Sequence, residues 1–520
     1  MCFALCWCHE NTAVALACHP TGRPRVHHLV QRPHHRADLV RIARAAMQER
    51  NLAPDFSPQA LQELLAIRGA ASDSSPQVHD LRALLWCSID NDDSRDLDQL
   101  TWCELLPDGE MRLLVAVADV DALVKKGSAI DAHASNNTAT VYTSACIFSM
   151  LPERLSTDLS SLNPGVDRLA LVTDMLFGSA GQLLRSTVYR AWVHNHAKLA
   201  YDAVSHWLTG QGPLPAAAQA VPGMDALLRE QDALAQKLRM LRHAKGSLEF
   251  ETFAPRALFE GERLVGIAQQ VQNRARQLIE EFMIAANGCN AGFLASAGTA
   301  SLHRVVRSPE RWLRIVEVAS QYGEALPAQP DARALEAFLA RRHQADPLRF
   351  ADLSLVIIKL MGSGEYVVKT PADTAIGHFG LAVRNYTHST APNRRYPDLV
   401  TARLLKAAIA GHKPPYSRAE LAALAQHCTR QEDAVRKVER RMRKSEAALV
   451  LETHIGEVFP ALVTGNTPEG VWVRLLQPPV EGKLQWTSDA AEPAVGSQLR
   501  VRLLSTDVER GYIDFGLAPR

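Results

Sequence analysis

An acidic segment between two apolar runs constrains the fold of this chain more than any other feature. Five carboxylates lie within nine residues: Asp90, Asp92, Asp93, Asp96 and Asp98. The flanking runs at 81–87 and 113–118 are apolar and typical of buried strands, which predicts an acidic loop fixed at strand ends. Crowded carboxylates repel one another unless a cation lies among them, and Mg²⁺ or Mn²⁺ suits such oxygen ligands. A solvated acidic turn is the alternative.

Length and charge set the outer limits. With 520 residues the chain exceeds one typical core, so we expect a globular protein of about two to four domains. Its 57 basic and 56 acidic side chains give a net charge of +1, which provides no global attraction to nucleic acids or membranes. A polyanion site would need local segregation of charge. Residues 430–444 form one such segment, a basic predicted helix that suits either a phosphate-tracking channel or a solvated face.

The cysteines and the N-terminus indicate a reducing compartment. The nine cysteines include no CxxC pair of the zinc-ribbon type and imply no disulfide framework. Cys and His residues gather within the first 35 residues, but their spacing matches no standard metal site. The apolar run at 1–18 is short, interrupted by polar residues and without a basic start, so we expect no signal peptide and no membrane contact. We expect a cytoplasmic monomer, and no protein partner is evident.

Periodicity divides the chain into four parts. Residues 1–36 show no clear period, and we expect a poorly ordered extension. Residues 37–80 form a small helical module with a linker, and Ser57 is the expected N-cap of its second helix. Residues 81–450 alternate strand-like and helix-like runs without a repeat, as one large domain. Residues 455–520 hold five short strands, typical of a small barrel of the OB type, with or without a nucleic-acid ligand.

Three further segments carry side chains that suit an RNA or phosphate site. Arg394 and Arg395 offer adjacent guanidinium groups, which grip phosphate oxygens bidentately. Glu280 and Glu281 lie on an otherwise apolar predicted helix, where at most one of them can reach solvent cheaply. Tyr142 ends a β-branched run, from which its ring could face a base. Taken singly, these features are also explained as a surface arginine pair, a salt-bridged glutamate and a core tyrosine.

In this order, the segments resemble the ribonuclease II family of 3′-to-5′ exoribonucleases, the RNB-domain enzymes. The resemblance rests on these motifs: Ser88-Ile-Asp-Asn-Asp-Asp-Ser-Arg-Asp-Leu-Asp, Met150-Leu-Pro-Glu-Arg-Leu-Ser, Leu278-Ile-Glu-Glu-Phe-Met, Thr390-Ala-Pro-Asn-Arg-Arg-Tyr-Pro-Asp and Arg436-Lys-Val-Glu. The C-terminal barrel also resembles the OB-type RNA-binding domain that follows the catalytic domain in this family. The usual N-terminal cold-shock barrels are not visible, and the helical module stands in their place. The resemblance implies an α+β fold: an RNB catalytic domain, a C-terminal OB-fold β-barrel and a small helical N-terminal module.

The resemblance also implies a metal site. Asp90, Asp96 and Asp98 would hold Mg²⁺ at the scissile phosphate, and Arg394 would neutralise charge in the transition state. The family motif usually ends in two aspartates, whereas here Asp98 is followed by Gln99. A glutamine carbonyl can still ligate Mg²⁺, but without charge, so we expect weaker metal binding, with Mn²⁺ as an alternative ion.

The RNA-binding residues follow from the same resemblance. Tyr142 would stack on the terminal base, and Phe250 would form a second stacking wall. Glu280 and Glu439 would hold the ribose end, where a carboxylate facing the 2′-hydroxyl favours RNA over DNA. The expected catalytic set is Asp98, Arg394, Tyr142 and Glu280.

The resemblance therefore implies a processive hydrolytic 3′-to-5′ exoribonuclease. We expect it to degrade single-stranded RNA to 5′-mononucleotides with Mg²⁺. The alternative is a catalytically silent RNA-binding relative with a regulatory role, in which Gln99 has abolished turnover.

Overall fold

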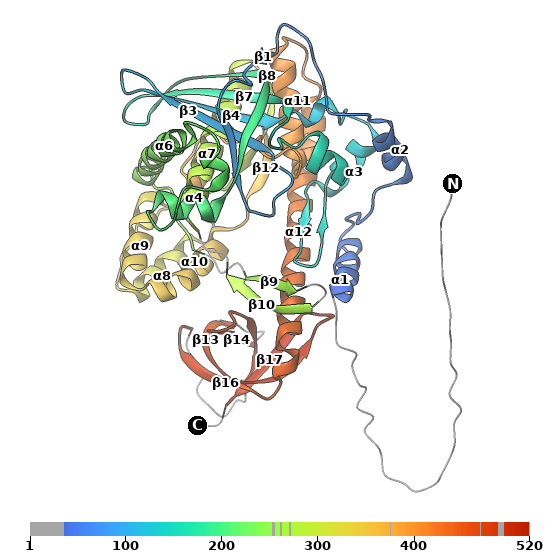
Figure 1. Cartoon of the computed structure of the whole chain (residues 1–520). Helices are drawn as coiled ribbons and strands as arrows, with labels where there is room; N and C mark the ends of the chain where they lie inside the picture. The colour runs from blue at the N-terminus through green and yellow to red at the C-terminus, as the bar shows by residue number, and fades with distance from the viewer. Residues whose placement is uncertain are drawn as a thin grey trace, which may run out of the picture. The chain divides into compact units, whose positions relative to one another are not determined.

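The computed structural model describes the chain from residue 36 to residue 518, with short gaps (Figure 1). The described ranges are 36–251, 255–260, 263–269, 272–374, 376–467, 470–486, 493 and 495–518. The extension expected at 1–36 therefore lies outside the described residues, except for Arg36. Among the described residues, no helix is both long and apolar enough to cross a membrane.

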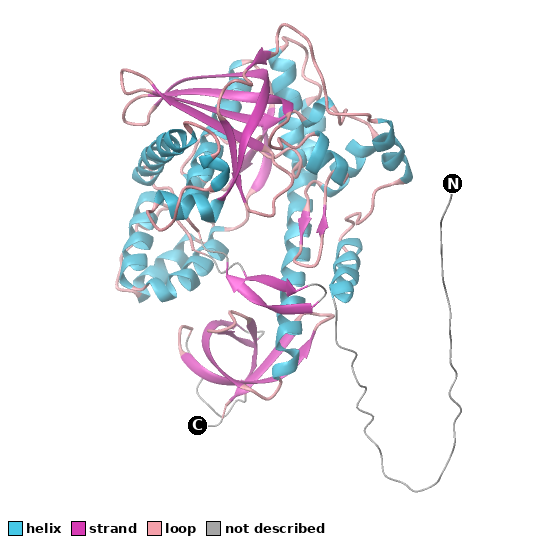
Figure 2. Ribbon diagram, in the orientation of Figure 1, coloured by secondary structure: helices cyan, strands magenta, loops and turns pink. Residues whose placement is uncertain are grey.

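Helices make up much of the described chain (Figure 2). In chain order they are α1 (Arg36–Gln48), α2 (Pro58–Ala66), α3 (Ala129–Asn137), α4 (Tyr201–Leu208), α5 (Ala216–Gln219), α6 (Met224–Ala244), α7 (Arg274–Ser296), α8 (Trp312–Gln321), α9 (Ala332–Ala345), α10 (Pro347–Met361), α11 (Tyr396–Ile409) and α12 (Arg418–Leu451). The longest, α12, begins with a capping box in which Ser417 and Glu420 satisfy each other's backbone N–H groups.

The two predicted N-terminal helices are present and pack on different neighbours. Helix α1 buries one apolar face, including Leu39 and Ile42, against α12. Helix α2 begins at the expected N-cap, where the Ser57 hydroxyl accepts a hydrogen bond from the N–H of Ala60, and packs against α3. The two helices therefore support different parts of the molecule.

The largest sheet is mixed and has the strand order β1-β8-β2-β3-β4-β7. Its strands are β1 (His79–Asp80), β2 (Trp86–Asp90), β3 (Gln99–Leu105), β4 (Met111–Ala118), β7 (Asp167–Phe177) and β8 (Leu183–Ala200). The first part of β8, up to His194, pairs with β7, and its last residues pair with β2. Helices α4, α6 and α7 pack against this sheet, so β4 is buried almost throughout. That burial explains the apolar run predicted as a strand at 113–118.

The strand predicted at 81–87 is shorter than expected. Residues 82–84 form a turn, in which the N–H of Leu84 donates to the carbonyl of Leu81, and β2 begins only at Trp86. The indole N–H of Trp86 donates to the same carbonyl of Leu81. These local hydrogen bonds favour a turn over an extended run, and the charged, exposed Arg82 lies in that turn.

The remaining strands form small sheets and a closed barrel. The two-stranded sheets are β5 (Val141–Tyr142) with β6 (Ile147–Phe148), β9 (Pro255–Glu260) with β10 (Arg263–Gln269), and β11 (Ser301–Val305) with β12 (Glu365–Lys369). The barrel has the order β13-β14-β15-β17-β16, from β13 (Val458–Thr467), β14 (Gly470–Leu475), β15 (Glu481–Gln485), β16 (Gln498–Asp507) and β17 (Tyr512–Leu517). The predicted five-stranded barrel is thus confirmed.

Helix α12 connects the parts that matter for the site. Along its length it packs against β12, α1, β5 and the barrel strands β16 and β17 (Figure 1). Its apolar residues Val438 and Met442 belong to a core shared with α1 and with the β5–β6 hairpin. The exact limits of the domains at 37–80, 81–450 and 455–520 stay predictions.

Candidate functional site

The acidic loop connects the end of β2 to the start of β3. Asp98, the last residue before β3, is 1% exposed. Its Oδ1 accepts a hydrogen bond of 2.9 Å from the backbone N–H of Asn393, and its Oδ2 lies 3.2 Å from Nε of Arg394. The carbonyl of Asp98 accepts the N–H of Ala118 at 3.0 Å, which continues the ladder between β3 and β4. The Asp98 carboxylate is therefore fixed both by its own sheet and by the segment before α11.

The electrostatics of the loop reflect its burial. Burial raises the pKa of Asp98 to about 7, and this effect outweighs the nearby Arg394, which lowers that pKa. Burial also raises the pKa of Asp96, and the Asp90 carboxylate adds to this rise. The Asp90 carboxylate thus disfavours ionisation of Asp96, and the Asp96 carboxylate disfavours ionisation of Asp98, as the crowding in the sequence predicts.

This donor set suits a hard divalent cation. Asp98 Oδ2 is buried and makes no hydrogen bond within the described residues. Asp90 is tied to its own loop, where its Oδ1 accepts the N–H of Asn91 at 2.7 Å and the hydroxyl of Ser94 at 3.0 Å. Across the part of the chain that is described, no three His, Cys, Asp or Glu side chains are gathered closely enough to hold an ion alone. Mg²⁺ in proteins commonly uses one or two carboxylates and completes its shell with water and substrate phosphate, so the residues fit this ion.

Gln99 opens β3 and is half-buried. Its backbone is paired with Val117 of β4. Within the described residues its side chain forms no hydrogen bond, so no protein group commits its carbonyl oxygen elsewhere.

The two adjacent arginines point to different partners. Arg394 faces Asp98, whereas Nη2 of Arg395 donates to Oδ1 of Asp398 at 2.7 Å. Asp398 is fully buried in the first turn of α11, and the same Oδ1 accepts the N–H of Ala391. Arg395 and Asp398 therefore shape the turn that presents Arg394, and only Arg394 is directed at the acidic loop.

Tyr142 lies on the β5–β6 hairpin and reaches the same place. Its hydroxyl donates to Oδ2 of Asp96 at 3.2 Å, and Tyr142 is 40% exposed. Its backbone N–H donates to Oε1 of Glu439 on α12, also at 3.2 Å. The structure thus brings together Asp96, Asp98, Tyr142, Arg394 and Glu439 from four separate segments of the chain.

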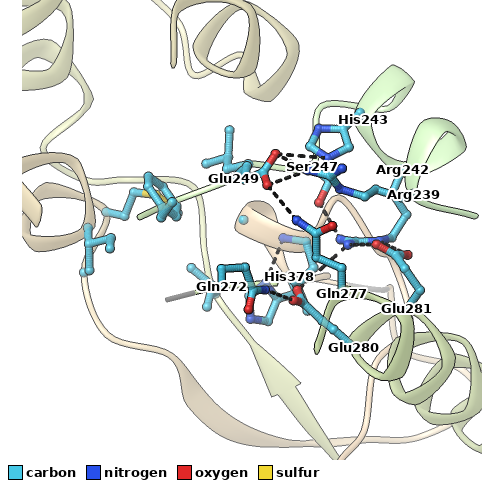
Figure 3. Close-up of a pocket in the computed structure, with 18 residues that line it drawn as sticks. Arg239, Arg242, His243, Ser247, Glu249, Gln272, Gln277, Glu280, Glu281 and His378 are labelled. Carbon is cyan, nitrogen blue, oxygen red and sulfur yellow. Dashed lines mark hydrogen bonds and ion pairs between the residues drawn. The ribbon is translucent and has the colours of Figure 1, made fainter. Parts of the chain in front are cut away.

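Glu280 and Phe250 lie in a cavity of about 320 Å³ between α6, α7 and α10 (Figure 3). Glu280 accepts a hydrogen bond of 3.2 Å from Nε2 of Gln272 and lies 4.0 Å from Nη2 of Arg242. Its neighbour Glu281 is buried and pairs with Arg242, whose Nε donates to Oε2 at 2.8 Å. Both glutamates line the cavity, but the side chain of Glu280 is 46% exposed and that of Glu281 only 3%, so one of the two reaches solvent, as the apolar helix predicts.

The cavity and the acidic loop flank the first turns of α7. Arg276 on this helix donates from Nη2 to Oδ1 of Asn91 in the acidic loop at 2.8 Å. Glu280 lies one turn further along. Within the described residues, no hydrogen bond or ion pair joins Glu280 to Asp98 or Arg394. A ligand that touches both groups must therefore extend along the start of α7.

Two site residues escaped the sequence reasoning. Asn393 holds Asp98 through its backbone N–H, and its Oδ1 accepts the hydroxyl of Ser160 at 2.6 Å. In the sequence, its position beside Arg394 in the motif at 390–398 could have indicated this role. Glu446 is buried on α12 and bonds to Ser144 in the turn after Tyr142. In the sequence, its spacing of seven residues from Glu439 could have indicated this role, because residues two helical turns apart lie on the same face of a helix.

Comparison with known proteins gives matches along most of the chain. A family model described as RNB domain matches residues 78–411, and one described as RNase II-type exonuclease C-terminal S1 domain matches residues 457–518. Ribonuclease R of Vibrio cholerae is 32% identical over 482 residues, which are 84% of this chain and 56% of that protein. Ribonuclease R of Escherichia coli K12 is 32% identical over 473 residues, 84% of this chain and 57% of that protein. The chain thus spans little more than half the length of these curated relatives.

A solved structure shows the same fold. Mycoplasma genitalium RNase R in complex with ribose-methylated single-stranded RNA superposes with a TM-score of 0.83 at 21% sequence identity, over 92% of this chain and 78% of that one. The expected α+β fold, with its C-terminal barrel and N-terminal helices, is confirmed by this likeness and by the matched domains.

Proposed function

Because the chain belongs to the RNB-domain family, as its sequence motifs indicated, we propose that it is a hydrolytic 3′-to-5′ exoribonuclease acting on single-stranded RNA. Curated relatives at 32% identity carry the name Ribonuclease R, and a relative of the same fold has been solved with single-stranded RNA. The products in this proposal are 5′-mononucleotides.

One observation carries the proposal most directly. A buried carboxylate, Asp98, lies 3.2 Å from the guanidinium of Arg394, beside Asp96 and the exposed ring of Tyr142. Burial of a carboxylate costs free energy, and carboxylates buried in this way are typical of functional sites. The arrangement offers acceptors for a cation, a fork-shaped donor for phosphate oxygens and an aromatic face for a base, which are the parts that hydrolysis at an RNA end requires.

Asp90, Asp96 and Asp98, with Gln99 as a neutral ligand, are the residues that would hold Mg²⁺. Since no three such carboxylates are gathered within the described residues, one or two of them at a time would bind the ion, and water and substrate phosphate would complete its shell. When bound, the ion supplies a water that is nucleophilic at neutral pH and positive charge beside the phosphate oxygens. Asp98 Oδ2 is buried and makes no hydrogen bond within the described residues, but it is ion-paired with Nε of Arg394 at 3.2 Å, so the ion and Arg394 would share this oxygen. Asn393 keeps Oδ1 of the same carboxylate in place through its backbone N–H.

The other side chains bind and orient the RNA end in this proposal. Arg394 stabilises the charge that grows on the non-bridging phosphate oxygens. Tyr142 stacks on the terminal base, and Phe250 in the cavity provides a second apolar wall. Glu439 uses Oε1 for the backbone of Tyr142, while its Oε2 makes no hydrogen bond within the described residues and is placed for a ribose hydroxyl. Glu280, at the cavity, holds the ribose in the same way.

Processive action is a further part of the proposal. The barrel and the basic helix α12, which pack against each other, provide a surface that can track the RNA backbone between successive cuts. The cysteines within the described ranges are all free thiols, which supports a cytoplasmic location. We propose that the protein acts there as a monomer.

The proposal is tested with the purified full chain, single-stranded RNA and Mg²⁺. We expect RNA to be shortened and 5′-mononucleotides to accumulate, while single-stranded DNA of the same sequence persists. An excess of unlabelled RNA added after binding should not stop degradation of the bound labelled strand if action is processive. A silent RNA-binding protein would retain the RNA at full length, and that result would reject the proposal in favour of the alternative.

The neutral ligand at position 99 predicts weak metal binding. Gln99→Asp should move the midpoint of the Mg²⁺ titration several-fold lower, because an added carboxylate strengthens the attraction for the ion. RNA affinity should hardly change. The midpoint is measured both by activity and by the shift in Tm of the RNA-free protein. A midpoint that stays constant or rises would mean that the surrounding residues are adapted to a neutral ligand.

The pKa of Asp98 predicts how pH affects metal binding. Its value of about 7, against an ordinary 3.8, means that the folded protein binds this proton more tightly than the unfolded chain. In metal-free protein the contribution of Asp98 to stability therefore falls as the pH rises from about 4 to about 7. Mg²⁺ requires the ionised carboxylate, so its midpoint should be several-fold higher at about pH 6 than at about pH 8. Thermal-shift titration checks this, and Asp98→Asn should remove most of the difference.

A further inference from the structure

The hairpin that carries Tyr142 is too small to be stable without contacts to the rest of the protein. Its strands β5 and β6 contain two residues each, and hairpins of this size have marginal stability in water. Thr143 closes the turn: its hydroxyl donates to the carbonyl of Cys146 at 2.6 Å and accepts the N–H of Cys146 at 3.0 Å. Val141 and Phe148 are buried in the core that α1 and α12 share. The position of the Tyr142 ring therefore depends on what α1 and α12 supply.

Helix α12 supplies two carboxylates to this hairpin. Oε1 of Glu439 accepts the backbone N–H of Tyr142 at 3.2 Å. Two helical turns further along, Oε1 of Glu446 accepts the backbone N–H of Ser144 at 3.2 Å, and Oε2 accepts the hydroxyl of Ser144 at 2.9 Å. From α1, Nε of Arg36 donates to the carbonyl of Ala145 at 2.8 Å. The turn is thus held by polar contacts from two helices.

Burial of the Glu446 carboxylate costs free energy unless hydrogen bonds replace the water it loses. Glu446 is 2% exposed, and burial raises the pKa of its carboxyl group to about 7. The two donors of Ser144 engage both of its oxygens, and Arg443 is a nearby cation that lowers the same pKa. A hydrocarbon side chain would pack at this place at lower cost, but it would leave the buried side of the turn without acceptors.

We propose that Glu446 is a positioning residue, which fixes the turn at Ser144 and thereby holds the Tyr142 ring where the terminal base of the RNA stacks. This inference rests on the stacking role proposed for Tyr142. Within the described residues, Glu446 contacts the turn at Ser144 and makes no hydrogen bond or ion pair with the acidic loop or with Arg394. It acts on the reaction only through the orientation of Tyr142, whereas Glu439 and Asp96 contact Tyr142 directly.

The experiment measures stacking separately from turnover. The probe is a short RNA with 2-aminopurine as its 3′-terminal base, bound to the full chain in EDTA, and the readout is quenching of the 2-aminopurine fluorescence. Glu446→Ala should lose most of the quenching that wild type shows and lower kcat/KM with Mg²⁺ by about tenfold to a hundredfold. Affinity for the RNA should change less than about twofold, since backbone contacts provide most of it.

A second variant keeps the proposal testable if the alanine variant folds poorly. Glu446→Gln can accept the N–H of Ser144 and donate to its hydroxyl, so it should restore most of the quenching and of kcat/KM. Ser144→Ala should reproduce part of the Glu446→Ala effect, and the double variant should show no additional loss, because both act through one contact. Glu317→Gln removes an exposed carboxylate on α8 that pairs with Arg314, away from α12 and the hairpin, and it should match wild type.

Three results would overturn the inference, and they are distinguishable. If Tyr142→Ala abolishes the quenching while Glu446→Ala leaves it intact, Glu446 does not position the ring. If Tyr142→Ala itself leaves the quenching intact, the stacking role of Tyr142 is wrong, and the inference falls together with that part of the proposed function. Additive losses in the Glu446/Ser144 double variant would also contradict a shared contact.

Discussion

Asp98→Asn should lower turnover on the order of 100-fold or more, with RNA affinity nearly unchanged. In the proposed function, the metal requires the ionised carboxylate of Asp98, whereas contacts to the RNA backbone elsewhere along the chain supply most of the affinity. Asparagine has the shape of the protonated aspartic acid, and the raised pKa of Asp98 shows that the folded protein already favours that neutral form. The variant should therefore fold as well as wild type. Steady-state kinetics, RNA binding in EDTA and Tm, all on one preparation, check the three expectations.

The result separates the role of Asp98 from a structural one. A Tm that drops together with activity would indicate that the bond from the Asn393 N–H to Asp98 mainly holds the fold. Turnover that survives in the variant, or RNA affinity that falls as far as turnover, would contradict the metal-binding role.

Arg394→Lys is the second substitution with a large expected effect. A lysine ammonium keeps the charge but cannot reproduce the two-pronged hydrogen bonding of a guanidinium, so turnover should fall by about 100-fold to 1,000-fold. The Tm should change little, because the side chain of Arg394 is partly exposed and its partner Asp98 is readily neutral. The kcat of the variant, measured at saturating RNA, is the quantity to compare.

Arg395→Lys is the matched control in the neighbouring position. Its guanidinium pairs with the buried Asp398 and does not face the acidic loop. We expect a loss of about 1–3 kcal/mol in the free energy of unfolding, and a kcat of the folded protein close to wild type. Equal losses of kcat in the two variants would show that neither arginine has the specific role assigned to Arg394.

The fold could be predicted to a large extent because its signals are local or lie in the order of motifs. The barrel follows from short strands at regular spacing, and α2 from its Ser57–Pro58 start. The family resemblance supplied the large domain, whose mixed sheet no periodicity could order. The failure of the strand prediction at 81–85 has a physical cause: the charged Arg82 is exposed, and the carbonyl of Leu81 accepts two local hydrogen bonds that close a turn.

The site was only partly accessible from the sequence. Adjacent arginines look equivalent in a linear motif, and only the turn closed by Asp398 decides that Arg394 faces Asp98. Asn393 donates to Asp98 through its backbone N–H. Every residue except proline has this group, so the residue type does not reveal the contact. The bond between Glu446 and Ser144 joins residues 302 positions apart, and no spacing rule reports such a pair.

If RNA is hydrolysed from a free 3′ end at the Asp98–Arg394 site, a circular RNA offers no end and should not be cut. The most direct measurement compares linear and circular forms of one single-stranded RNA, with the linear form labelled at its 5′ end, in the presence of Mg²⁺. We predict that the linear RNA is degraded, that its label stays on progressively shorter RNA, and that the circle remains intact. Cleavage of the circle, or early release of the 5′ label as a mononucleotide, would contradict the account.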